Sequence, residues 1–246
     1  MRRIAVSLTK GGVGKTTTAV NLAAGLAAAG HEVLLIDADT QGQAGKSLGV
    51  QPASGLNELV AGEASLEQVI VPARERLALL AGSKSLAGLK RLIARRDYGA
   101  ERTLAEALAP LEGRYDFVIV DTAPGWDVLT INVLFYADEV LAPVSLEVMT
   151  LQGLSEFAQS LASIQRYRDS LTLRYVLPTF LDRRVRKSEE ILAQLARLLS
   201  HPALPADPLQ RAAFRGARLS ATHLRICPQL PRRRGLSPAD RKDRTR

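Results

Sequence analysis

The chain has 246 residues, of which 46% are hydrophobic and 4% aromatic, and its formal net charge is +8. This length allows one α/β domain with a sizeable core, and no apolar run approaches the roughly 20 residues that a membrane-spanning helix needs. Because Met1-Arg2-Arg3 leads straight into an apolar run, we expect no signal peptide, and the lone Cys227 excludes an internal disulfide, as is usual in a reducing cytoplasm. The excess of positive charge favours a polyanionic partner.

A glycine-rich loop follows the first predicted strand. The apolar residues 4–6 lead into Lys10-Gly-Gly-Val-Gly-Lys-Thr-Thr17, and a helix is predicted over residues 16–29 with Gly30 as its C-terminal cap. A strand, a loop ending in Gly-Lys-Thr and a helix form the context of a phosphate-binding loop. We expect the loop to bind ATP through Gly11, Gly12, Val13, Gly14, Lys15, Thr16 and Thr17.

The residue types of this loop suit phosphate chemistry. Glycines let backbone N–H groups approach phosphate oxygens where a side chain would obstruct them. We expect Lys15 to bring positive charge to the β and γ phosphates and Thr16 to offer its hydroxyl to Mg²⁺, while the following helix turns its positive end toward the anion. Lys10 is not needed for this account, and from spacing alone it is equally well a solvated lysine at a strand end.

Two aspartates follow the next predicted strand. Residues 33–36 are continuously apolar, as expected for a buried parallel strand, and they lead into Asp37-Ala38-Asp39-Thr40-Gln41-Gly42. Carboxylates at the carboxyl end of a strand beside a phosphate loop are placed for chemistry on the bound nucleotide. The alternative is a polar turn with an N-cap aspartate.

The segment from Gly42 to about Arg102 gives weaker signals. Its apolar residues predict short helices near residues 56–60 and 66–70 and a strand over residues 77–81. Five cations within residues 84–96 form either a solvated face or a DNA contact: Lys84, Lys90, Arg91, Arg95 and Arg96. A helix is predicted over residues 103–111, after which Gly113 lets the chain turn back toward the sheet.

A third aspartate, Asp121, follows directly after the apolar residues 117–120. This is the pattern of a Walker B strand, whose carboxylate holds a water of the Mg²⁺ shell. Any buried strand can end in aspartate, so this pattern gains its meaning from the phosphate loop. A further strand and loop are predicted over residues 174–182, and helices over residues 152–168 and from about Ser188. Four cations before Ser188 form either a solvated loop or a patch that contacts DNA phosphates without reading base sequence: Arg183, Arg184, Arg186 and Lys187.

Three segments together resemble the ParA/MinD family of deviant Walker A ATPases: KGGVGKTTT, VLLIDADTQG and YDFVIVDTAPG. The resemblance implies a doubly wound, mainly parallel α/β sheet flanked by helices, and residues 137–144 resemble the next strand of that family. It also implies that Lys10 reaches across a dimer interface to the partner's nucleotide, that Lys15 serves its own subunit, and that Asp39 positions the attacking water. Asp37 would then support the Mg²⁺ region, and Asp121 would hold a water of the Mg²⁺ shell.

The same resemblance implies a function. In that family ATP holds two subunits face to face, the dimer binds DNA non-specifically, and the centromere-binding protein ParB stimulates the hydrolysis that releases the DNA. We therefore expect a partitioning ATPase that is cytoplasmic and associated with the nucleoid, with residues 183–187 as DNA-binding candidates. The few residues before Ile4 leave no room for a helix-turn-helix, as in the short form of the family. The exchange of a family proline for Thr40 loosens a turn without removing a functional group.

Other interpretations compete with this one. A MinD-like membrane switch shares the loop but needs a C-terminal amphipathic helix, which the sequence does not show. A relative of the nitrogenase iron protein needs cluster cysteines, which Cys227 alone cannot supply. A defective, non-hydrolysing basic binding protein is a third alternative.

Residues 199–246 do not continue the pattern of the ATPase domain predicted over residues 1–198. This tail holds six prolines and the run Arg232-Arg-Arg-Gly235, but no stretch that could close a sheet. One explanation is a disordered basic tail that clasps DNA. The other is a one-base insertion or deletion between about Arg197 and Pro208, because the codons of the tail, read one base later, can encode a string containing NVRLSEAP. Since that string resembles the family's usual C-terminus, we interpret the tail as a displaced reading frame.

Overall fold

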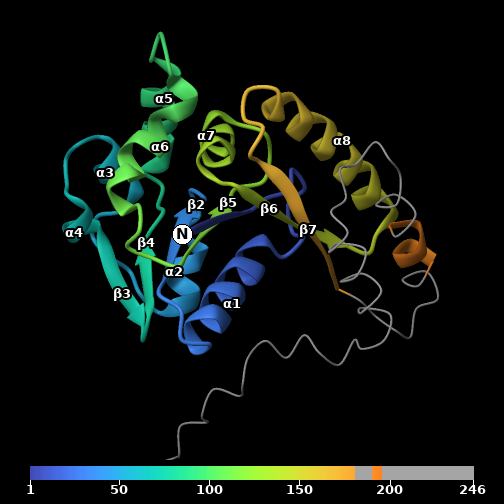
Figure 1. Ribbon diagram of the computed structural model, residues 1–246, viewed down its shortest axis with the longest axis horizontal. Helices are drawn as coiled ribbons and strands as arrows, with labels where there is room; N and C mark the ends of the chain where they lie inside the picture. The colour runs from blue at the N-terminus through green and yellow to red at the C-terminus, as the bar shows by residue number, and fades with distance from the viewer. Residues whose placement is uncertain (181–189, 196–246) are drawn as a thin grey trace, which may run out of the picture.

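The computed structural model describes residues 1–180 and 190–195, and within helix α8 it does not describe the side chains of residues 148–151. One twisted sheet runs through the molecule, with helices packed on both of its faces (Figure 1). The strands are β1 (Arg2–Val6), β2 (Val33–Ala38), β3 (Ile70–Arg74), β4 (Leu77–Leu80), β5 (Phe117–Thr122), β6 (Glu139–Ser145) and β7 (Thr172–Thr179). The helices are α1 (Lys15–Ala28), α2 (Gln43–Leu48), α3 (Leu56–Val60), α4 (Leu66–Val69), α5 (Leu86–Ala94), η1 (Ala100–Arg102), α6 (Thr103–Leu108), η2 (Ala109–Leu111), α7 (Val128–Tyr136) and α8 (Val148–Gln165).

The strand order explains where a site can form. The order is β3-β4-β2-β5-β1-β6-β7, and every neighbouring pair is parallel except the antiparallel pair β3 and β4 at one edge. The central strands β2, β5 and β1 therefore point their carboxyl ends to the same edge. In open sheets of this kind, ligands bind at that edge. The doubly wound, mainly parallel α/β fold predicted from the sequence is confirmed.

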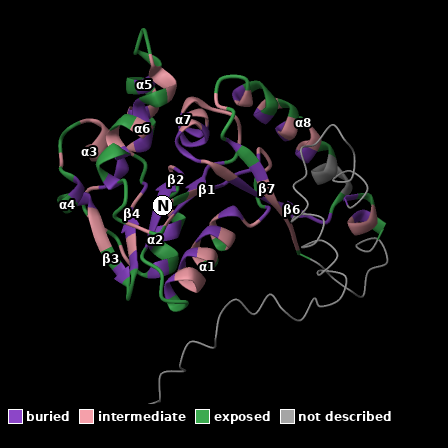
Figure 2. Ribbon diagram, viewed as in Figure 1, coloured by how far each residue is buried: buried purple, intermediate pink, exposed green. Residues whose placement is uncertain are grey.

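The core has two halves, one on each face of the sheet, because successive side chains of a buried strand point to opposite faces. In β2, Leu34 and Ile36 pack with α3, α5, α6 and α7, whereas Val33 and Leu35 pack with α1 and α2. The central strands are buried on both sides, as Figure 2 shows. Alanines line the buried side of α1, which brings this helix close to the strands: Ala19, Ala23 and Ala27.

Several boundaries follow the sequence prediction closely. Helix α1 ends at Ala28, and Gly30 follows in the left-handed conformation at φ 96°, as its role in the cap requires. The predicted strands near residues 33, 77, 117, 137 and 174 all exist, and the helix predicted over residues 152–168 spans Val148–Gln165. Residues 190–195 are helical, in agreement with the helix predicted from about Ser188. The basic residues 183–187 and the tail 199–246 lie outside the described residues.

Other predictions at this level were wrong or incomplete. The prediction of a helix continuing to Ile70 is wrong at its end, because Ile70 begins β3, which pairs antiparallel with β4. Helices α5 and α7 were not predicted. In α5, Leu86, Leu89 and Ile93 are buried, whereas the basic residues of this helix are not. Helix α7 is buried on most of its sides.

Candidate active site

The phosphate loop spans residues 7–14, between β1 and α1, at the carboxyl edge of the sheet. Gly12 and Gly14 adopt left-handed conformations at φ 73° and 88°, and Gly14 is the N-cap of α1. Residues with a side chain rarely adopt this geometry, so these two glycines determine the shape of the loop. Neighbouring segments hold it in place: Gly125 N donates to Thr9 O at 2.9 Å, and Thr179 Oγ1 donates to Val13 O at 2.9 Å.

The two lysines of the loop lie in different surroundings. Lys15 is buried, and its Nζ donates to the carbonyl of Lys10 at 2.8 Å, across the inside of the loop. Burial lowers the pKa of Lys15, while Asp121 and Asp39 act in the opposite direction. Lys10 instead lies at the rim, where its Nζ forms an ion pair with Glu147 Oε2 at 2.7 Å. Lys15 thus lies where a phosphate within the loop would contact it. Lys10 points away from the inside of the loop, toward Glu147.

The loop after β2 is organised around Asp37. Its Oδ1 accepts from the backbone N–H of Asp39 at 2.9 Å, and its Oδ2 accepts from that of Ala44 at 3.0 Å. Burial raises the pKa of Asp37 to about 6, against the lowering effect of these two hydrogen bonds. Asp39 Oδ1 in turn accepts from Gln41 N at 3.0 Å. The Asp37 carboxylate therefore fixes the backbone that holds Asp39 near the phosphate edge.

Asp121 lies one residue before the end of β5, opposite Asp37 in the sheet register. It is fully buried, and among the described residues no donor makes a hydrogen bond of normal geometry to either carboxylate oxygen. Burial raises the pKa of Asp121 to about 7, and the nearby Thr16 hydroxyl lowers it by a smaller amount. A buried carboxylate without donors is costly unless a cation or its water shell approaches.

These residues fit Mg²⁺ that arrives with a nucleotide. Mg²⁺ keeps several waters and binds through one or two protein oxygens plus phosphates. Asp121 and the Thr16 hydroxyl supply such oxygens at the end of the phosphate loop. In the part of the chain that the structure describes, no group of three or more His, Cys, Asp or Glu could hold a metal ion alone. Bound Mg²⁺ would neutralise phosphate charge at this place.

Comparison with known proteins agrees with this geometry. A protein-family model described as an AAA domain matches residues 1–173. The chain is 41% identical to the chromosome-partitioning ATPase Soj of Thermus thermophilus over 199 residues, which are 79% of this chain and 76% of the relative. It is 34% identical to the chromosome partitioning protein ParA of Myxococcus xanthus, over 79% of this chain and 70% of the relative. The chain belongs to the ParA/Soj family of partitioning ATPases.

Solved structures support the nucleotide chemistry of this ParA/Soj chain. A Mycobacterium smegmatis protein described as cobyrinic acid a,c-diamide synthase, with bound ATP analog and magnesium, has a TM-score of 0.76 and 33% identity, over 88% of this chain and 92% of that chain. The same protein with ADP and magnesium gives the same TM-score and identity. A plasmid partition protein from Borrelia burgdorferi shares the fold, with a TM-score of 0.69 at 24% identity. The chain is an ATPase, and its cofactors are ATP and Mg²⁺.

The structure brings most of the predicted site residues together. Those of the phosphate loop, Asp37, Asp39 and Asp121 all lie at the carboxyl ends of β1, β2 and β5. The predicted DNA-binding residues, Arg183, Arg184, Arg186 and Lys187, lie outside the described residues. Glu147, which pairs with Lys10 from a position 137 residues along the chain, was not predicted. A single glutamate between a strand and a helix carries no motif, so the sequence offers no signal for it.

No helix in residues 1–180 and 190–195 combines the length and apolar character of a membrane span.

Proposed function

We propose that this ParA/Soj ATPase is a DNA-partitioning switch. Mg-ATP builds a face-to-face homodimer through Lys10, and the dimer binds DNA non-specifically. A ParB-like partner then stimulates hydrolysis by water positioned at Asp39, and the DNA is released. Such a protein works in the cytoplasm on the nucleoid. The names of the Thermus and Myxococcus relatives support the partitioning role.

The observation that carries the dimer proposal is the different placement of the two loop lysines. Lys15 is buried within the loop, where one lysine suffices for the subunit's own phosphates. Lys10 retains about a third of its side-chain exposure and forms an ion pair with the more exposed Glu147. Exposed ion pairs contribute only about 0–1 kcal/mol, so an incoming phosphate can replace Glu147 at little cost. A second lysine at the rim thus suits a nucleotide of another subunit.

The dimer is tested by light scattering after gel filtration. In an Asp39→Ala background, where hydrolysis is expected to be slow, Mg-ATP should convert the protein from monomer to dimer. Adding Lys10→Ala should abolish the dimer and leave ATP bound, whereas Lys15→Ala should abolish nucleotide binding itself. Arg114→Ala is the matched control, because Arg114 also forms an exposed ion pair, with Glu67 at 3.4 Å, and it precedes β5 at the opposite edge of the sheet from the loop. An unchanged dimer in the Lys10→Ala protein would refute the proposed contact.

The Lys10–Glu147 pair gives a finer test of the same contact. Glu147→Gln keeps the shape of the side chain and removes its charge, so Lys10 is released without being altered. We expect the ATP-dependent dimer to become about two- to fivefold tighter, the range of an exposed ion pair. A weaker dimer would mean that Glu147 itself belongs to the interface.

DNA binding is tested with a duplex of arbitrary sequence by fluorescence anisotropy. Mg-ATP should promote binding, Mg-ADP should not, and changing the duplex sequence should have little effect. Replacing Arg183, Arg184, Arg186 and Lys187 with glutamine should lower the slope of log affinity against log salt by about one for each phosphate that is no longer neutralised. Binding with an unchanged slope would assign the DNA-binding surface to another part of the protein.

We also propose that the ATPase domain ends near residue 198 and that residues 199–246 result from a displaced reading frame. Sequencing the gene across codons 190–215, with an intact mass of the protein, decides this. A restored frame supports a complete ATPase. If sequencing confirms the present reading frame, the basic tail is genuine. Nucleotide binding should then be weak, because this tail replaces the closing segment of the family.

Cobyrinic acid a,c-diamide synthesis, named for the Mycobacterium smegmatis structures, is a less favoured function for this chain. Those structures are 33% or 34% identical to this chain, against 41% for the Thermus partitioning ATPase.

A further inference from the structure

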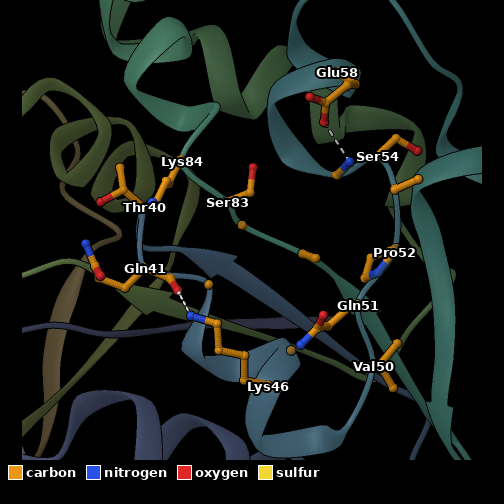
Figure 3. Close-up of a pocket in the computed structure, with 16 residues that line it drawn as sticks. Thr40, Gln41, Lys46, Val50, Gln51, Pro52, Ser54, Glu58, Ser83 and Lys84 are labelled. Carbon is orange, nitrogen blue, oxygen red and sulfur yellow. Dashed lines mark hydrogen bonds between the residues drawn. The ribbon is translucent and has the colours of Figure 1, made fainter.

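A cavity of about 290 Å³ lies beside the catalytic loop and outside the phosphate site. Three segments enclose it: the loop after β2 with the start of α2, residues 50–55 with Glu58, and the loop after β4 (Figure 3). None of the residues expected to bind ATP or Mg²⁺ lines this cavity. Its volume is close to the roughly 300 Å³ at which pockets for small molecules begin.

Glycines fix the walls of this cavity. A side chain on Gly82 would lie 2.4 Å from the carbonyl oxygen of Asp37, and one on Gly55 would lie 2.1 Å from that of Ala81. One on Gly42 would lie 2.7 Å from the carbonyl oxygen of Gly82. The three backbones therefore cross at distances that only glycine permits. Because these crossings set the spacing of the walls, the cavity is formed before any ligand enters.

The polar lining is positively charged. Lys46 and Lys84 contribute two cations, and the single carboxylate is that of Glu58. Both oxygens of Glu58 are already used locally: Oε2 accepts from Gly55 N at 2.7 Å, and Oε1 accepts from Asn57 Nδ2 at 3.2 Å. Glu58 therefore caps α3 and does not neutralise the lysines. A ligand with a negative charge would find two cations here, against one carboxylate whose oxygens already accept hydrogen bonds.

The remaining lining suits a short organic body. Val50, Pro52 and Ala81 give the cavity an apolar wall, and Figure 3 shows Val50 and Pro52 on the side away from Gln41. Ser83 and Gln41 add further hydrogen-bonding groups. The cavity is much larger than an inorganic phosphate needs, so an anion attached to a few carbon atoms fits better.

We propose that this cavity binds a small organic anion, a phosphate monoester or a dicarboxylate, whose charged group contacts Lys46 and Lys84. Lys46 links the ligand to the catalytic loop. Its Nζ donates to Gln41 O at 2.8 Å, and Gln41 N donates to Asp39 Oδ1 at 3.0 Å. A ligand that draws Lys46 away from Gln41 changes the support of Asp39 and with it the rate of hydrolysis. This second step rests on the proposed role of Asp39, whereas binding itself does not.

Binding is tested by calorimetric titration of glycerol 3-phosphate and, separately, of succinate. Because the phosphate loop also binds anions, the full-length protein is first saturated with Mg-ADP. At least one probe should bind, and Lys46→Gln or Lys84→Gln should weaken it about tenfold, as expected for the loss of a hydrogen bond to a charged group. Arg95→Gln, which removes an exposed cation outside the cavity, should change the affinity less than about twofold.

A second pair of variants tests the cavity without altering charge. Ala53→Phe fills the cavity from its wall and should weaken binding as strongly as the lysine variants, whereas Ala87→Phe on exposed α5 surface should not. Preference for glycerol 3-phosphate identifies a phosphate ligand, and preference for succinate identifies a carboxylate. Absence of saturable binding to both probes, or equal binding in all variants, overturns the proposal.

The link to hydrolysis needs its own measurement. A saturating probe should change kcat at saturating Mg-ATP by about twofold or more in the wild type and leave it unchanged in the Lys46→Gln, Lys84→Gln double variant. Binding without a change in kcat overturns the link and leaves the binding site. If Asp39→Ala hydrolyses ATP normally, the failure lies in the proposed role of Asp39 and not in the cavity.

Discussion

Strands β2 and β5 each carry a buried aspartate one residue before the strand ends, and the two lie opposite each other, yet their carboxylates have different environments. Asp37 accepts hydrogen bonds from the backbone N–H groups of Asp39 and Ala44, whereas Asp121 has the nearby Thr16 hydroxyl but no hydrogen bond of normal geometry among the described residues. Burial raises both pKa values, to about 6 for Asp37 and about 7 for Asp121. Asp37 therefore shapes a loop, and Asp121 is left with free oxygens for the Mg²⁺ region. A strand-terminal aspartate acquires its role from the backbone around it.

The largest effect is expected at Asp39, which the loop of Asp37 positions. Asp39→Ala removes the carboxylate proposed to hold the attacking water, so kcat for ATP hydrolysis should fall about 10²- to 10⁴-fold. Nucleotide affinity should change little, because Asp39 is not expected to touch the phosphates in the ground state. Single-turnover hydrolysis and binding of a fluorescent ATP analogue give the two values. A kcat close to that of the wild type would assign the water to another residue.

A smaller effect is expected for Mg²⁺ at Asp121. Asp121→Asn removes the charge that attracts the Mg²⁺ shell, and the affinity for Mg-ATP should fall about 10- to 100-fold, as for other groups just outside a metal's ligands. The affinity for ATP in the presence of EDTA should stay the same. Asp37→Asn is the control, and it should alter Mg²⁺ dependence less because its oxygens face backbone N–H groups. Equal Mg²⁺ defects in both variants would remove the distinction between the two loops.

Stability should change in opposite directions at the two aspartates. Asp37→Asn turns an amide toward a backbone N–H that now lacks an acceptor, so unfolding free energy should fall by about 1–3 kcal/mol. Asp121→Asn removes a buried charge and breaks no hydrogen bond of normal geometry, so the Mg²⁺-free protein should be as stable as the wild type or more stable. Urea unfolding at pH 8 in EDTA measures both. Destabilisation of similar size by both variants would contradict the hydrogen-bond pattern.

The sequence was sufficient to predict the strands and the loop at the centre of the candidate site. Gly12 and Gly14 occupy conformations that need glycine. The strands that carry Asp37 and Asp121 are buried on both faces, so their apolar runs are continuous. Local chemistry and fold therefore agree here, and such agreement makes a segment predictable.

The missed features depend on contacts that are distant in sequence or on the absence of a pattern. Residues 70–74 become a strand only because β4 pairs with them, and Lys10 meets Glu147 across 137 positions. Helix α7 has apolar residues on nearly all sides because it is buried, so it lacks the periodicity that marks a surface helix. The different surroundings of Asp37 and Asp121 could not be predicted either, since the difference lies in backbone N–H groups that no side-chain pattern encodes.

The last predicted effect is a pH dependence of stability to which the two aspartates contribute unequally. The pKa of Asp121 in the folded protein, about 7, lies above its value of about 3.9 in an unfolded chain. Between these two values the folded state retains a proton that the unfolded state has lost, so unfolding free energy should fall as pH rises and level off above about pH 7. Asp37, with a pKa of about 6, acts in the same direction over a narrower window.

Urea unfolding in EDTA from pH 5 to pH 8 tests this dependence. In wild-type protein the unfolding free energy should decline over this range, and in Asp121→Asn the decline should shrink to the part due to Asp37. In buffer without EDTA, saturating Mg-ATP favours the ionised carboxylate of Asp121. It should therefore also reduce the decline of unfolding free energy with pH. A slope that Asp121→Asn leaves unchanged would mean that the carboxylate at the end of β5 is not the group that holds the proton, and the contrast between the two loops would then fail.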